Sequence, residues 1–118
     1  MDRIRIKGGR QLKGDILISG AKNAALPLMV SAMLSDKSLT LHNVPRLADI
    51  TTMIQLLRQH GVDVSTIPGE NGHAHGTTLV LKAGQITSTT APYDIVRKMR
   101  ASVLVLGVLL AREGQARV

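Results

Sequence analysis

Two long stretches of the chain are apolar over several helical turns, and they predict the two main helices. The first spans residues 22–34 and the second about 93–111, which is apolar all round in its latter half. A helix without a polar face is typical of one buried on every side, so we expect both to lie in a core. Pro27 falls within the first helix, where it is tolerated only near the first turn, because an N–H missing there costs little.

A third helix is predicted over residues 46–60, with a different pattern. Its apolar side chains recur at the spacing of one helical face: Leu47, Ile50, Ile54 and Leu57. Polar side chains occupy the remaining positions, which indicates one buried and one solvated face. Gly61 follows directly and is the residue type that most often ends a helix. We therefore expect an amphipathic helix at the surface.

Short segments with alternating or β-branched residues predict strands before and between the helices. They cover residues 3–6, 15–19, 38–42, 62–65 and 77–83, with a further extended piece at 86–90 and a last strand that begins at 116–118. A strand that stops at its third residue lacks its ladder partners. We therefore expect the chain to be the first part of a longer one.

The two apolar helices also belong to a possible internal repeat. Residues 25–37 align with residues 101–113, and each copy is a helix, a polar turn and then a strand. Short apolar helices resemble one another freely, so a chance likeness stays open. A true repeat gives the unit β-α-β-α-β-β, of which the chain holds about one copy and the start of a second.

Composition narrows the class of protein. The 118 residues are 44% hydrophobic and 19% charged, which is typical of one small folded domain. The absence of cysteine excludes disulfides and a thiol nucleophile within the chain. The N-terminal residues lack the apolar core of a signal peptide, and the longest apolar run, 103–111, is too short for a bilayer. We therefore expect a cytoplasmic protein that does not bind membranes.

The excess of basic residues predicts an anionic ligand. Lys and Arg number 15 against 8 Asp and Glu, for a formal charge of +7. Single-stranded nucleic acid is usually held by stacked aromatic side chains, and this chain has one Tyr, no Trp and no Phe. Small anions fit this composition better than nucleic acid.

Lys22 and Asn23 are the first candidate ligand-binding residues. They stand at the start of the first apolar helix, where free N–H groups and the helix dipole favour an anion. They are flanked by residues too small to cover them: Gly20, Ala21, Ala24 and Ala25. A solvated lysine on a loop is the alternative, and chemistry alone leaves the two about equally favoured.

A second basic cluster lies at residues 97–100, near the start of the other apolar helix. In the repeat alignment, Lys98 falls on Lys22, and Arg100 lies two residues further on. Two parallel helix ends that carry cations are able to hold one multiply charged ligand between them. A solvated face, with Asp94 and Lys98 as an i,i+4 pair, is the alternative.

His73 and His75 have the spacing of a metal-binding pair. Two ligands on a glycine-rich loop, without a third nearby, make a poor site. A polar loop is the better interpretation, and we expect no metal.

Four segments carry motifs that are specific enough to indicate a family: 18–27 (ISGAKNAALP), 43–45 (NVP), 91–94 (APYD) and 99–102 (MRAS). With them the chain resembles, from Met1 to Val118, the enolpyruvyl transferases of peptidoglycan synthesis, the UDP-N-acetylglucosamine 1-carboxyvinyltransferases. The sister family of the shikimate pathway usually has a Gly-Asp-Lys-Ser type sequence where residues 20–23 read Gly-Ala-Lys-Asn. That difference favours the cell-wall branch.

The resemblance implies an α/β fold, the inside-out α/β barrel of the enolpyruvyl transferases, in which each of two domains consists of three βαβαββ units. Residues 1–21 would then be strands that belong to the other domain of the full-length protein. Residues 22–118 would be the first unit and the start of the second unit of the substrate-binding domain.

The resemblance also implies a reaction, the transfer of enolpyruvyl from phosphoenolpyruvate to the 3-hydroxyl of UDP-N-acetylglucosamine. Lys22 and Asn23 match the phosphoenolpyruvate site, and Arg100 matches a contact with the UDP-sugar. No metal or organic cofactor is implied. The family's catalytic loop is expected beyond Val118, so no catalytic residue is assigned and the chain alone is expected to be inactive and to self-associate through its apolar helices.

A stand-alone anion-binding or assembly module with the same fold is the alternative to an enzyme fragment. The sequence that follows Val118 distinguishes the two: continuation into the family's catalytic loop favours the enzyme fragment, and a natural stop favours the module.

Overall fold

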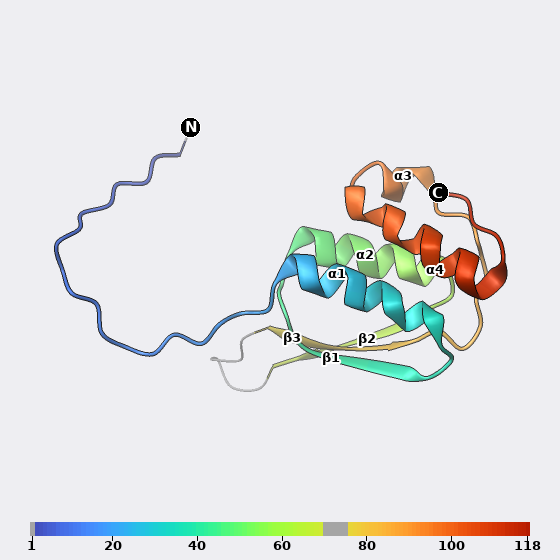
Figure 1. Cartoon of the computed structure of the whole chain (residues 1–118), viewed down its shortest axis with the longest axis horizontal. Helices are drawn as coiled ribbons and strands as arrows, with labels where there is room; N and C mark the ends of the chain where they lie inside the picture. The colour runs from blue at the N-terminus through green and yellow to red at the C-terminus, as the bar shows by residue number, and fades with distance from the viewer. Residues whose placement is uncertain (1, 70–75) are drawn as a thin grey trace.

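Helices cover one face of a small antiparallel sheet, and an extended N-terminal segment points away from both (Figure 1). The computed structural model describes residues 2–69 and 76–118. The three strands found there are β1 (Ser38–Val44), β2 (Asp63–Pro68) and β3 (Thr77–Lys82). They lie in the order β1-β3-β2, and β3 is antiparallel to both neighbours. Each of these strands lies within three residues of its predicted position.

The helical segments follow the predicted order, except that the second long helix is interrupted. They are α1 (Lys22–Ser31) with its 3₁₀ continuation η1 (Ala32–Leu34), α2 (Ala48–Gln59), α3 (Tyr93–Val96), η2 (Arg100–Val103) and α4 (Leu104–Glu113). Pro27 is the sixth residue of α1, beyond the first turn where the sequence allows it. The helix continues because the carbonyl that loses its partner belongs to Asn23, at the exposed start of α1.

The core lies between the helices and the inner face of the sheet. Strand β3 alternates, so that Leu79 and Leu81 are buried beneath the helices. From the helices come the largest fully buried side chains: Met29, Met33, Met53, Leu56, Leu57, Val105 and Leu109. Helix α1 packs against both α2 and α4.

The prediction that α1 and α4 are buried on every side is wrong. Leu28 and Leu34 are 50% and 56% exposed, and Val103 and Leu110 are 56% and 47% exposed. Each helix rests one face on the sheet and its neighbours, and nothing in residues 2–69 and 76–118 covers the other face. The apolar pattern therefore predicts that these segments are helical, but it does not predict how much of each helix surface is buried within this chain.

The second long helix is broken, which corrects the prediction of one helix over residues 93–111. Helix α3 is followed by Met99 in an extended conformation, with φ −147° and ψ 116°, and the chain then re-enters helical structure at Arg100. Met99 is 5% exposed, so the break turns its side chain into the core. Helix α4 ends as a helix commonly does, at Gly114 with a left-handed φ of 74°.

The predicted strands at residues 3–6 and 15–19 are absent from the structure. Residues 2–19 are exposed and extended, without a partner strand in the described chain, and they run away from the sheet (Figure 1). A strand needs a neighbour to bond its backbone groups, whatever its own pattern. The expected extended pieces at 86–90 and 116–118 meet in one parallel bridge, between Thr90 and Arg117.

A bulge in β1 contacts the segment that leads into α1. Leu41 pairs with Leu79 and Val44 with Thr77, so two residues of β1 face one residue of β3. Asn43, within the bulge, has a positive φ of 56°, and its side-chain amide donates to the Ile18 carbonyl at 3.3 Å. A Cβ on Gly20 would collide with the Asn43 carbonyl oxygen, so only glycine fits there.

Polar side chains, one buried and one partly buried, connect the ends of two helices to the rest of the fold. His60, at the end of α2, is fully buried and its ring Nδ1 donates to the Ser88 carbonyl at 2.7 Å. The guanidinium of Arg112 donates to the carbonyls of Met33 and Gly84, at 2.9 and 3.1 Å. These contacts hold α2 and α4 in register with the segment that follows β3.

We expect Gly61→Ala to lower the free energy of unfolding by about 1–3 kcal/mol, as overpacked sites do. Gly61 has a φ of +93°, and an added Cβ would lie 2.8 Å from both the Gln85 carbonyl oxygen and Thr87 Oγ1. Gly107→Ala is the matched control: its Cβ meets open space within α4, so stability should rise by up to about 1 kcal/mol. Urea unfolding of the 118-residue chain measures both. Equal stability of the Gly61 variant and the unsubstituted chain would contradict the packing described.

Candidate functional site

The first turns of α1 and α2 and the break before η2 enclose a hollow of about 280 Å³. We call it the basic hollow. Its lining residues are Lys22, Asn23, Leu26, Asp49, Lys98, Met99, Arg100 and Ala101. All the binding residues that the sequence predicts, Lys22, Asn23 and Arg100, therefore line one cavity although 77 residues or more separate Arg100 from the other two along the chain.

Lys22 is the first residue of α1, where the sequence places it. Ala21 precedes the helix, and its carbonyl accepts from the N–H groups of Ala24 and Ala25, at 3.2 and 2.9 Å. The N–H groups at the very start of a helix have no helical partner, and in the described chain no side chain caps them. The positive end of the helix dipole thus lies beside the Lys22 ammonium group.

Asp49 forms an ion pair with Lys22 that the sequence did not reveal. The distance from Lys22 Nζ to Asp49 Oδ2 is 2.8 Å, and the two side chains are 44% and 36% exposed. Asp49 lies in the first turn of α2, so the pair joins the starts of two neighbouring helices. From its spacing in the sequence, Asp49 is expected among the polar residues on the solvated face of this helix. An aspartate in the first turn of a helix is a sequence feature that could have indicated a role for Asp49. Its partner could not be identified from the sequence, because Lys22 lies 27 residues away.

The break at Met99 brings the second basic cluster to the basic hollow. Because Met99 is extended and buried, Lys98 and Arg100 on either side of it are exposed and line the cavity. The expected alternative, an ion pair between Asp94 and Lys98, is not what forms: Asp94 Oδ1 lies 3.7 Å from Arg97 Nε instead. Lys22, Lys98 and Arg100 face one carboxylate, so the hollow carries an excess of positive charge.

Only some of the small residues around Lys22 leave room for a ligand. Ala21 and Ala24 are exposed, as a ligand-binding role requires. Gly20 is small because the Asn43 carbonyl lies against it, and Ala25 is 6% exposed within the core. Of the four small residues that were expected to make room for a ligand, two are therefore small because of packing within the protein.

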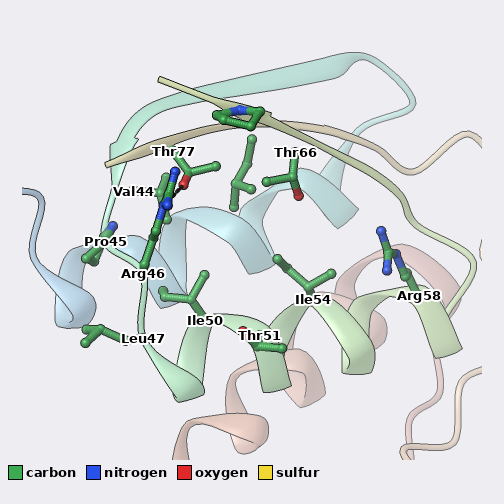
Figure 2. A pocket seen from close by; sticks show the side chains of 12 residues that line it. Val44, Pro45, Arg46, Leu47, Ile50, Thr51, Ile54, Arg58, Thr66 and Thr77 are labelled. Carbon is green, nitrogen blue, oxygen red and sulfur yellow. Dashed lines mark hydrogen bonds between the residues drawn. The ribbon is translucent and has the colours of Figure 1, made fainter. Parts of the chain in front are cut away.

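A larger groove of about 690 Å³ runs between α2 and the sheet (Figure 2). Arg46 and Arg58 lie at its two ends, and apolar side chains such as Ile50 and Ile54 form its helical wall. Both guanidinium groups already donate within the protein, Arg46 to Thr77 Oγ1 at 3.3 Å and Arg58 to the Val64 carbonyl at 2.8 Å. None of the predicted site residues lines this groove.

The part of the chain that the structure describes contains no group of three residues able to hold a metal ion. His73 and His75, the pair considered from the sequence, lie outside the described residues. Within residues 2–69 and 76–118, no helix has the length and apolar character needed to cross a bilayer.

Comparison with known proteins supports the motifs found in the sequence. A UDP-N-acetylglucosamine 1-carboxyvinyltransferase of Rhodospirillum centenum is 64% identical over 124 residues, which cover 100% of this chain and 28% of that protein. One of Paramagnetospirillum magneticum is 61% identical, with the same coverage of both chains. The resemblance to the cell-wall branch is confirmed, and this chain spans little more than a quarter of the length of these relatives.

A solved structure supports the fold independently. The crystal structure of the enolpyruvyl transferase NikO from Streptomyces tendae superposes with a TM-score of 0.71 at 22% identity. The match covers 92% of this chain and 24% of that one. At this identity the likeness concerns the fold alone.

The family model described as EPSP synthase (3-phosphoshikimate 1-carboxyvinyltransferase) matches residues 6–118, nearly the whole chain. Since the fold of a solved enolpyruvyl transferase agrees with that match, this chain belongs to the EPSP synthase family.

Proposed function

We propose that this chain is part of an enzyme that transfers enolpyruvyl from phosphoenolpyruvate to the 3-hydroxyl of UDP-N-acetylglucosamine, a step of peptidoglycan synthesis in the cytoplasm. The observation that carries the proposal is that Lys22, Asn23 and Arg100 line one basic hollow in a chain 64% identical to a protein named for this activity. The complete activity belongs to a longer protein, because the chain spans 28% of that relative.

Lys22 and Asn23 contact phosphoenolpyruvate in this proposal. The cation and the adjoining N–H groups at the start of α1 suit a ligand that carries both a phosphate and a carboxylate. Negative charge moves during addition to the vinyl group and elimination of phosphate, so a cation at this place stabilises the transition state as well as the bound substrate.

Arg100 contacts the UDP-sugar in this proposal. It lies across the hollow from α1, on the segment that enters η2. A guanidinium group presents a planar set of donors that suits phosphate oxygens, and its contact is remote from the carbon that reacts. No residue of this chain is given the role of nucleophile, general acid or general base, and no cofactor is required.

The finer architecture is part of the same proposal. Residues 22–118 form the first βαβαββ unit and the start of the second in an inside-out α/β barrel domain, and residues 1–21 pair with strands of the other domain. The exposure of six large apolar side chains in the N-terminal segment supports this, since they need a partner surface: Ile4, Ile6, Leu12, Ile16, Leu17 and Ile18.

The substrate contacts are tested by kinetics of a full-length chimera, in which this chain replaces the matching segment of the Rhodospirillum centenum relative. We expect Lys22→Ala to lower kcat by at least roughly a hundredfold, because it removes a charge needed in the transition state. Arg100→Ala should mainly raise the KM for the UDP-sugar, because a remote contact binds ground and transition states alike.

Lys37→Ala is the matched control, because the Lys37 side chain is 86% exposed and lies outside the basic hollow. It should turn over like the unsubstituted chimera. Normal turnover by the Lys22 variant would make Lys22 a solvated residue and would refute the proposed site.

The isolated chain is expected to self-associate, because apolar faces of α1 and α4 and of the N-terminal segment are uncovered in it. Sedimentation of the 118-residue chain should show a concentration-dependent increase in mass. Leu28→Lys with Leu34→Lys places charges on the exposed face of the first helix and its continuation, and should reduce the association. A monomer at all concentrations, with cooperative melting, would contradict this expectation.

A further inference from the structure

We propose that Asp49 is a positioning residue, which holds the Lys22 ammonium group at the basic hollow so that Lys22 meets the anionic substrate in one fixed orientation. This inference rests on the proposed function. It adds a residue that lies outside the four sequence motifs described above.

The contact itself is well defined. One carboxylate oxygen, Asp49 Oδ2, lies 2.8 Å from Lys22 Nζ, a short distance for a charge-assisted hydrogen bond. An ammonium group has three N–H donors, and this contact uses one of them. The remaining donors stay available for a phosphate or carboxylate oxygen in the basic hollow, which both side chains line.

The helix ends explain why a carboxylate is needed there. Lys22 begins α1, where the positive end of the helix dipole disfavours a cation. Asp49 lies in the first turn of α2, where the dipole of that helix favours an anion. Without Asp49, the repulsion from α1 and from the nearby Lys98 and Arg100 would drive the long Lys22 side chain into solvent.

Stability alone does not explain the pair. Lys22 is 44% exposed and Asp49 is 36% exposed, and an ion pair so open to water adds little to folding. Restricting a flexible lysine has a different effect, because a group already in place loses less conformational freedom when the substrate arrives. The expected consequence is therefore on turnover.

The test uses the full-length chimera with Asp49→Asn and Asp49→Glu. Asp49→Asn keeps the shape of the side chain and removes its charge, and we expect kcat to fall about tenfold while the KM for the UDP-sugar changes less than about twofold. Asp49→Glu restores the charge and should recover most of kcat. Asp94→Asn is the matched control, a first-turn aspartate of α3 that pairs with Arg97 outside the hollow, and it should leave kcat unchanged.

A double-mutant cycle separates positioning from a general structural role. If Asp49 acts through Lys22, then Asp49→Asn has no further effect on kcat once Lys22 is Ala. Independent losses that multiply in the double variant would overturn the inference, as would a lower KM for phosphoenolpyruvate in Asp49→Asn, which would mean that Asp49 only repels the substrate.

The same set of variants distinguishes the two levels of the proposal. Unchanged kcat in Lys22→Ala would refute the proposed site itself. A large loss in Lys22→Ala together with unchanged kcat in Asp49→Asn would leave the site in place and refute only the role given to Asp49.

Discussion

The packing of α1 between α2 and α4 is the constraint on which the candidate site depends. Met29 and Met33 from α1 and its continuation, and Met53 from α2, are fully buried above the sheet. Their burial fixes the axes of the helices, and flexible methionine side chains fill the irregular space between them. The charged residues at the helix starts are brought together as a consequence of this apolar packing, since Lys22, Lys98 and Arg100 are themselves exposed and lie outside the core.

At that end of the helices, cationic side chains outnumber carboxylates. Asp49 balances Lys22, and Asp94 lies near Arg97, whereas Lys98 and Arg100 line the basic hollow without an ion pair in the described chain. Two neighbouring cations and the positive end of a helix repel one another, and a polyanionic ligand relieves that repulsion. The fold therefore concentrates positive charge where the proposed substrates bring negative charge.

Features governed by local pattern were predictable from the sequence. The amphipathic spacing of α2 and the alternation along β3 each depend on residues close in sequence, and both elements form within two residues of their predicted limits. The motifs around Lys22 and Arg100 were also sufficient to indicate the family, although only the fold shows that these residues share one cavity.

Features that depend on distant partners were not predictable. Met99 interrupts a helix because its side chain packs into a core that other elements form. The residues next to Met99 in the sequence do not indicate that this core exists. From the sequence alone Asp49 is expected to be solvated, because its partner Lys22 is close to it only in the folded structure. Residues 3–6 and 15–19 have the pattern of strands, yet a strand forms only against a partner, which the described chain does not provide.

The claim that the basic hollow holds an anionic substrate is tested most directly by lysine footprinting. The full-length chimera is treated briefly with acetic anhydride, with and without phosphoenolpyruvate and UDP-N-acetylglucosamine, and the acetylation of each lysine is read by mass spectrometry. We expect the substrates to protect Lys22 and Lys98, which line the hollow, and to leave Lys37 unchanged, since its side chain is 86% exposed elsewhere. Equal acetylation of Lys22 with and without saturating substrates would contradict the assignment of the hollow as the binding site.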